Sequence, residues 1–260
     1  MGVKLKDIEL LLNFMKNKNF KSLSIIELGE QELKLWEKDL TNIYIKKWKD
    51  TNPRIWPIKP TSDRYAFYSK DFFNYYFKEC ISIDFDCHCN KSIKVNLEID
   101  IFKQNINKQF DILTNYGTTE HVGQKFTSTP GSKVKQIIIT TKNPQYHTFK
   151  NIHNLVKKGG VFFHNVPFAK NKNNLNNHGA YCYNENFFNE LAMINNYTII
   201  KNKLYMGLER PNFIDVIMIK NENNNFMSED AFVKLDGLFA TKNKRSDETT
   251  FYNKIKNFLI

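Results

Sequence analysis

Short apolar runs alternate with amphipathic stretches along the chain, and this pattern predicts strands that alternate with helices. Helical spacing of apolar residues marks 4–16, 69–78, 145–156 and 184–195, and a further helix is expected at 30–35. Ser69 and Asn184 stand where helix N-caps are expected. Runs typical of buried strands occupy 22–28, 80–85, 93–97, 110–114 and 160–164.

Two further apolar runs, 197–205 and 213–220, are separated by too few residues for a crossover helix. They are therefore predicted to be antiparallel neighbours. Strands that alternate with helices predict a parallel sheet with helices on both faces. The expected fold class is α/β, with a Rossmann-like sheet that is mostly parallel and has an antiparallel late strand. Residues 1–260 fit a single domain.

Composition changes this picture little. The chain has 41% hydrophobic and 14% aromatic residues, which suffice for a sizeable core. Its net charge of +11 suggests an anionic partner such as RNA. However, the lysines are scattered and form no compact basic block, so a biased composition is the preferred explanation.

Cys87, His88 and Cys89 form a Cys-His-Cys triplet that invites comparison with zinc sites. Without a second ligand pair at typical spacing, reduced thiols are the preferred interpretation and no metal is expected. The sequence shows no signal peptide and no apolar run near the ~18 residues that span a membrane. We therefore expect a cytoplasmic protein with no membrane partner.

Polar and glycine-containing motifs follow the predicted strands. Glu27-x-Gly29-x-Gln31 follows the first, Asp84 closes the second, and Asn115-Tyr116-Gly117 follows 110–114. In an open parallel sheet, ligands bind beyond the carboxyl ends of the strands, where the strand order reverses. The motifs therefore predict a nucleotide-type site, although ordinary turns and solvated carboxylates are the alternative. The single glycine does not make a dinucleotide fingerprint.

Three histidines flank the predicted strand ends: His121, His164 and His178. Each is a candidate general base because imidazole titrates near neutral pH, and each could instead be an ordinary loop histidine. Glu120 is adjacent to His121 and could orient its ring. The sequence has no Gly-x-Ser-x-Gly elbow and no phosphate-binding loop, which argues against a serine hydrolase and a P-loop enzyme.

A series of motifs carries a family resemblance: E-x-G-x-Q at 27–31, IDFD at 83–86, LEID at 97–100, FDILTNYGTTEHV at 110–122 and KKGGVFFHNVP at 157–167. In this order they resemble the class I S-adenosylmethionine-dependent methyltransferase superfamily, over about residues 22–220. NYGTTEHV and NNHGAYCYNENFF are similar to a subgroup of unsettled substrate. The helix at 4–16, a possible insertion at 123–143 and an extension at 221–260 lie outside the family pattern.

The resemblance implies S-adenosylmethionine as the cofactor and assigns roles to the strand ends. Glu27, Gly29 and Gln31 would hold its methionine end, Asp84 and Phe85 its ribose, and Asp100 its adenine. Asn115, Tyr116 and Gly117 would lie beside the sulfonium, with His121, then His164 and His178, as the acceptor's base. We expect methyl transfer to a small-molecule or sugar-like acceptor. RNA methylation and a non-catalytic interaction protein on the same fold are the alternatives.

Overall fold

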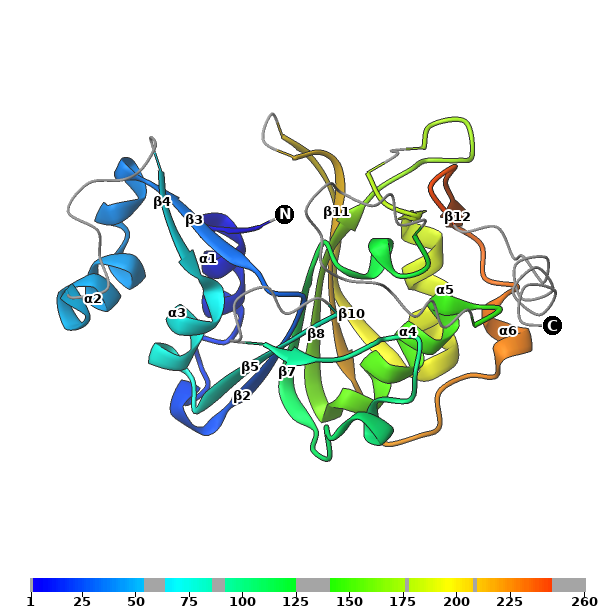
Figure 1. Ribbon diagram of the computed structural model, residues 1–260, viewed down its shortest axis with the longest axis horizontal. Helices are drawn as coiled ribbons and strands as arrows, with labels where there is room; N and C mark the ends of the chain where they lie inside the picture. Colours follow the sequence, from blue (N-terminus) through cyan, green and yellow to red (C-terminus); the bar gives the residue numbers. More distant parts are fainter. Residues whose placement is uncertain are drawn as a thin grey trace, which may run out of the picture.

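A seven-stranded sheet separates two layers of helices (Figure 1). The structure is a computed structural model that describes residues 2–53, 64–85, 92–124, 141–175, 178–207 and 210–244. The strand order is β10-β11-β8-β7-β2-β5-β6. The bounds are β2 Ser24–Leu28, β5 Glu79–Asp84, β6 Ile93–Lys94, β7 Phe110–Tyr116, β8 Val156–Pro167, β10 Tyr197–Gly207 and β11 Arg210–Lys220.

The strand order reverses at β2. β2 pairs in parallel with both β5 and β7, and the chain adds later strands to one side and then to the other. β11 is antiparallel to both β8 and β10 and lies between them. The Rossmann-like, mostly parallel sheet and the antiparallel late pair are therefore confirmed. The point beside β2 is where such sheets bind ligands.

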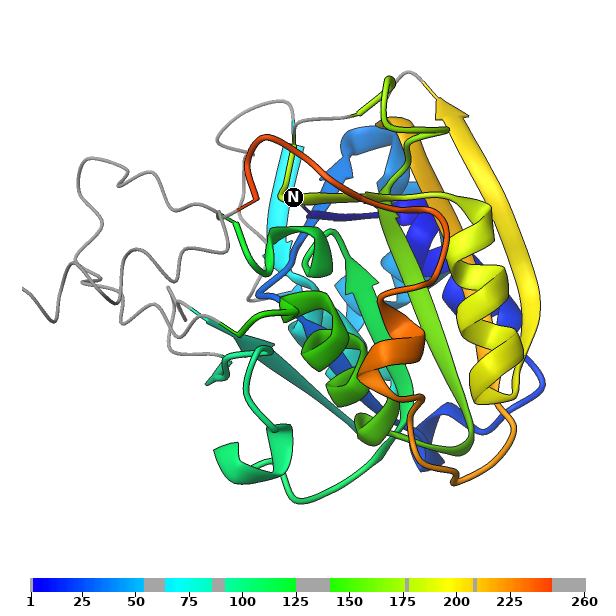
Figure 2. The same ribbon diagram turned by 90° about the vertical axis from the view of Figure 1, so that its right-hand side faces the viewer.

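Helices cover both faces of the sheet. α1 Leu5–Phe14, α2 Ile43–Thr51 and α3 Ser69–Tyr76 lie on one side, and α4 Pro144–Leu155, α5 Glu185–Asn195 and α6 Glu229–Phe232 on the other (Figure 1). Figure 2 faces the second side, with α6 (orange) between α4 (green) and α5 (yellow).

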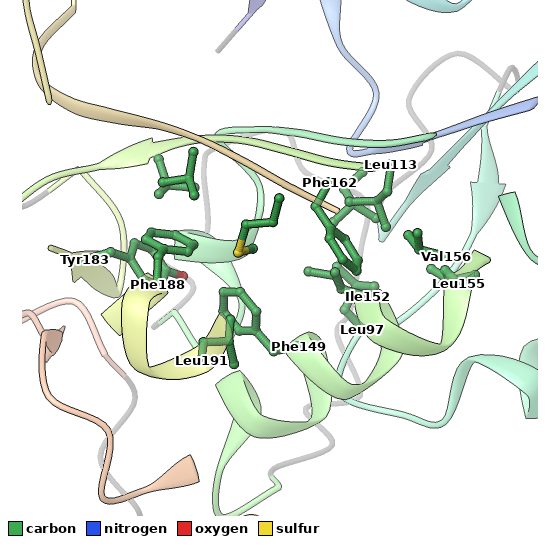
Figure 3. Close-up of a cluster of buried hydrophobic side chains, with 14 of the residues drawn as sticks. Leu97, Leu113, Phe149, Ile152, Leu155, Val156, Phe162, Tyr183, Phe188 and Leu191 are labelled. Atoms are coloured by element: carbon green, nitrogen blue, oxygen red, sulfur yellow. The ribbon is translucent and has the colours of Figure 1, made fainter. Parts of the chain in front are cut away.

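The sheet has a hydrophobic core on each face, and successive residues of a strand point alternately into one core and the other, as the two-residue period of a strand requires. Ile112 of β7 packs with the first layer of helices and Leu113 with the second. In Figure 3, Leu113 and Phe162 of the sheet face Phe149 of α4 and Phe188 of α5.

The predicted helix at 30–35 is wrong. This segment forms β3 Glu32–Trp36, which pairs in parallel with β1 Gly2–Lys4 and antiparallel with β4 Arg64–Tyr68 in a separate three-stranded sheet. Leu33 and Leu35 are buried between more exposed neighbours, so the segment has the two-residue period of a strand. The turn after β2 therefore leads into the strand β3 rather than into a helix. The helix that directly precedes the next strand of the main sheet, β5, is α3.

Smaller corrections concern element ends and caps. β6 has only two residues of the expected 93–97, and β8 extends beyond 160–164 at both ends. Asn184 caps α5 as predicted, accepting a hydrogen bond from the Phe187 amide at 3.2 Å. Tyr68, not Ser69, is at the N-cap position of α3. Nothing in the sequence pattern indicated the pairing of β9 Tyr181–Tyr183 with β12 Leu238–Ala240.

Several sequence predictions fall outside the described residues. They are the Cys-His-Cys triplet at 87–89, residues 125–140 of the expected insertion, and residues 245–260 of the expected extension. Within the described ranges, no helix combines the length and apolar character needed to cross a membrane.

Gly29 and Gly159 form a matched pair for testing the turn after β2. Both have a left-handed backbone, with φ of 76° and 75°. A Cβ at Gly29 would clash with the Thr118 hydroxyl and lie 2.7 Å from Gln31 Nε2, whereas one at Gly159 would meet nothing within 4 Å. Both alanine variants lose about 1–2 kcal/mol for the backbone, and overpacking adds about 1–3 kcal/mol at Gly29 only. Denaturant unfolding measures the difference, and equal losses would contradict the close approach.

Candidate functional site

The turn after β7 is built around the Asn115 side chain, which is fully buried. Its Oδ1 accepts the amides of Thr118 and Thr119, both at 3.2 Å. Its Nδ2 donates to Thr119 Oγ1 at 2.9 Å and lies 3.0 Å from His164 Nδ1. Because backbone amides can only donate, they fix which end of the Asn115 amide is oxygen. All four hydrogen-bonding positions of this amide are therefore used.

The same turn is joined to the end of β2. Thr118 Oγ1 donates to the Leu28 carbonyl at 2.7 Å. Gln31 Nε2 contacts both the Leu28 carbonyl and Thr118 Oγ1 at 3.2 Å. Gly29 lies directly against Thr118, where a side chain has no room. Gly29, Gln31 and the residues after Asn115 thus form one hydrogen-bonded unit at the reversal of strand order.

Glu27 lies in β2, two residues before Gly29, and is 1% exposed. Burial raises its pKa to about 8, and the hydroxyls of Ser69 and Ser82 only partly offset that effect. Ser69 Oγ lies 2.5 Å from Glu27 Oε1 and 2.9 Å from the Gln31 carbonyl. One hydroxyl hydrogen cannot serve both oxygens, so a protonated Glu27 that donates to Ser69 satisfies the arrangement. Within the described residues, Glu27 Oε2 has no hydrogen-bond partner.

The acidic end of β5 adjoins this group. Asp84 Oδ2 accepts the Glu30 amide at 2.6 Å, and both Asp84 and Phe85 are half-buried. Asp100 makes a local contact: its carboxylate accepts the Phe102 amide at 3.0 Å and caps the short helix Ile101–Gln104. The structure therefore brings Asp84 to the turn that contains Gly29, whereas this contact of Asp100 is local to its own loop.

Tyr116 and Gly117 complete the residues expected beside the cofactor. Tyr116 is 3% exposed and packs with Ile112 in the core beneath α1 and α3. Gly117 has φ of 82°, which favours glycine and lets the chain leave β7 sharply. These two residues shape the turn, and the polar groups that the turn presents come from its neighbours.

His164 lies inside the core, 3% exposed, among the rings of Phe149, Phe162 and Phe188. Burial lowers its pKa to about 3. Since Asn115 Nδ2 donates to His164 Nδ1, the ring proton must be on Nε2. This imidazole is neutral at physiological pH and holds Asn115 in place.

His121 and His178 come together, although the sequence separates them widely. Their ring centroids are 4.9 Å apart, and His121 Nε2 lies 3.8 Å from Glu120 Oε1. Burial is the main cause that lowers the pKa of both histidines, which favours the neutral form of each. Glu120 is fully buried, His121 is partly exposed and His178 is exposed. This group lies beyond the carboxyl end of β7.

Sequence reasoning missed the residues that support the site. Tyr183 hydroxyl donates to Gln145 Oε1 at 2.8 Å and lies 3.2 Å from Thr119 Oγ1, and Gln145 Nε2 donates to the Thr119 carbonyl at 2.7 Å. Thr118 and Thr119 were visible in the NYGTTEHV motif as small polar residues after a glycine. Ser69, Gln145 and Tyr183 are distant in sequence and carry no local signal for this role.

The fold is the Rossmann-like fold that the methyltransferase resemblance predicted. Solved structures similar to this chain include the CurJ carbon methyltransferase (8% identity, 82% of this chain and 53% of that one, TM-score 0.43). A second is a Clostridium acetobutylicum S-adenosylmethionine-dependent methyltransferase (10% identity, 85% of this chain and 93% of that one, TM-score 0.44). A third is the Methanococcus jannaschii fibrillarin pre-rRNA processing protein (12% identity, 79% of this chain and 70% of that one, TM-score 0.38). The chain thus spans about half the length of the CurJ structure. At these identities, the likeness concerns the fold alone. No protein-family model and no curated protein sequence matches the chain.

Glu27→Gln tests the buried carboxyl. Because the folded pKa of about 8 is above the ordinary value of 4.5, the contribution of Glu27 to stability is complete below pH 4.5 and is lost as the pH rises to 8. A glutamine stays neutral and can still donate to Ser69. At pH 7 the variant should be about 3 kcal/mol more stable than the wild type, with the difference vanishing near pH 4.

Urea unfolding across pH 4–8 measures this difference. Glu222→Gln makes the same substitution at an exposed position and should give no such pH-dependent gain. A Glu27→Gln protein that is less stable than wild type at pH 7 would show that Glu27 is ionised and well solvated.

Proposed function

We propose that this chain binds S-adenosylmethionine at the carboxyl ends of β2, β5 and β7 and transfers its methyl group to a small-molecule or sugar-like acceptor. The observation that carries the proposal is Glu27, a buried carboxyl whose Oε2 has no hydrogen-bond partner within the described residues, beside a glycine turn at the reversal of strand order. A buried carboxyl without an ion partner is costly, and such groups are concentrated at functional sites.

The residues present fit the cofactor's cationic end. The cofactor supplies a methyl group already activated on a positive sulfonium, and its methionine end carries an ammonium. A cation near Glu27 would lower the pKa of this carboxyl and fill the hydrogen-bonding position of Oε2. Gly29 and Gln31 would line the same end, where the left-handed Gly29 turns the backbone and lets it pack directly against Thr118.

Asp84 is the proposed ribose ligand, with Phe85 beside it. The Glu30 amide holds one carboxylate oxygen of Asp84 in a fixed direction, which orients the group for a pair of hydroxyls. We keep Asp100 as the candidate nearest the adenine, and Asn115, Tyr116 and Gly117 as the turn beside the sulfonium.

His121 and His178 are the proposed acceptor-side residues. They lie together beyond the carboxyl end of β7, and a neutral imidazole can accept a proton from an acceptor hydroxyl or hold that hydroxyl in line with the methyl group. His164 is the third candidate from the sequence. Its pKa of about 3 and its enclosure by aromatic rings suit positioning of Asn115 better than proton transfer.

Calorimetric titration with S-adenosylmethionine and S-adenosylhomocysteine tests the cofactor assignment. Asp84→Asn keeps an acceptor for the Glu30 amide but loses the charge, and it should weaken binding about tenfold, or 1.4 kcal/mol. Asp236→Asn, which alters a contact with Asn186 away from these strands, should bind as the wild type does.

Proton release gives a second readout of the same titration. At pH 7 Glu27 is mostly protonated, and binding of a cationic ligand should expel up to one proton, seen as a dependence of the heat on the buffer. Glu27→Gln should lose this dependence. No binding of either compound by a folded sample would overturn the proposal in favour of an interaction protein. Binding that is followed by methylation of RNA, with steep salt dependence, would overturn the small-molecule acceptor.

A further inference from the structure

Three potential metal ligands lie close together beyond the carboxyl end of β7. The ligand atoms of Glu120, His121 and His178 all lie within 4.8 Å of one another. Two of them belong to the short helix Thr119–His121, and the third lies in the loop before β9. Imidazole nitrogens with one carboxylate oxygen are the ligand set of many zinc enzymes.

The backbone holds the two segments against each other. The Ala180 amide donates to the Glu120 carbonyl at 2.7 Å, and Thr241 Oγ1 donates to the Gly179 carbonyl at 2.6 Å. A Cβ on Gly179 would lie 2.7 Å from the Glu120 carbonyl oxygen. Only glycine permits this approach, and it brings His178 next to His121. The group is therefore assembled by the fold before any ligand arrives.

The tautomer of His121 also suits a cation. His121 Nδ1 lies 2.7 Å from Gln124 Oε1. An amide oxygen can only accept, so Nδ1 carries the ring proton and Nε2 carries a lone pair. That lone pair is 3.8 Å from Glu120 Oε1, too far for a hydrogen bond between them. Metal-bound histidines commonly donate their other nitrogen to an oxygen in this way.

We propose that Glu120, His121 and His178 bind a divalent transition-metal ion, with Zn²⁺ as the best match to the ligand set. Bonds of about 2.0–2.1 Å in a tetrahedral site place the ligand atoms roughly 3.4 Å apart. The pair formed by His121 and Glu120 already approaches this spacing. His178 is exposed, and a rotation of its side chain can close the remaining distance of up to about 1.4 Å.

A three-ligand site leaves one position of a tetrahedral ion open. If the proposed methyl transfer holds, that position would bind an acceptor oxygen beside the end of β7, and the two histidines would then hold the ion instead of accepting the proton themselves. A bound cation would lower the pKa of an acceptor hydroxyl, so that its proton is lost to water. The resulting oxygen would then attack the methyl carbon as the carbon–sulfur bond of the sulfonium breaks. This role rests on the proposed function, whereas the binding of the ion does not.

Titration of the metal-free, full-length protein with Zn²⁺ tests the site in the absence of cofactor and acceptor. Calorimetry should show one Zn²⁺ bound through this group, and Co²⁺ in its place should give the visible absorption of a low-coordinate site. His178→Gln should lose this binding, and because the side chain is exposed, its fold should be unaffected. Gln124→Leu should weaken binding about 10- to 100-fold by releasing the orientation of His121.

Two controls make the result specific. His147→Gln removes a half-buried histidine on α4 and should bind Zn²⁺ as the wild type does. Cys87→Ser combined with Cys89→Ser removes the alternative ligands suggested by the sequence and should leave the binding intact. The proposal is overturned if His178→Gln binds Zn²⁺ normally, if the cysteine variant abolishes binding, or if the wild type binds none. Since no cofactor is present, these outcomes are independent of methyl transfer.

Discussion

The rest of the site depends on the hydrogen bonds of the Asn115 side-chain amide, which uses all four of its hydrogen-bonding positions. Its oxygen accepts two successive backbone amides and its nitrogen faces a hydroxyl and a ring nitrogen, all inside the protein. Loss of any one partner would leave a buried polar group unsatisfied, which costs about 1–3 kcal/mol. The backbone beyond β7 is therefore fixed in one path, and that path places Thr118 against Leu28 and brings His121 to His178. The same bond fixes the tautomer of His164, whose neutral state follows from its burial.

Glu27 differs from Asn115 because its burial is only partly compensated by hydrogen bonds. Its burial disfavours the charged form, and the neighbouring serines compensate only in part. A neutral side chain of similar size would stabilise the protein better at pH 7. Buried groups that lower the stability of the folded protein are expected at sites where the binding of a ligand compensates for that loss. Under the proposed function, that ligand enters at the end of β2, because Glu27 is one residue from Leu28 and two from the left-handed Gly29.

The sequence predicted the sheet well because strand and helix periods differ and most apolar runs have one clear period. It failed at 30–35, where Leu33 and Leu35 alternate over only five residues and a glycine turn precedes them. The ends of β2, β5 and β7 were predictable as polar motifs after apolar runs. Ser69, Gln145 and Tyr183 were not, because their roles arise from contacts across 26 to 64 residues of chain. Burial of His164 also depends on tertiary packing, which neighbouring residues in sequence do not reveal.

One short segment serves both sides of the site. Between Asn115 and His121, the chain leaves the sheet, touches the end of β2 through Thr118, and then pairs with the loop at 178–180 through the Glu120 carbonyl. Gln145 and Tyr183 hold Thr119 in the middle from two different elements. A ligand that shifts Gly29 or Thr118 must therefore strain a segment that also carries Glu120 and His121. Because packed and hydrogen-bonded segments resist small displacements, the contact between Gly29 and Thr118 and the pair of Glu120 and His121 are held at a fixed separation. Transfer of a small group between a cofactor and an acceptor requires that kind of rigidity, since its rate falls steeply with misplacement of the reacting atoms.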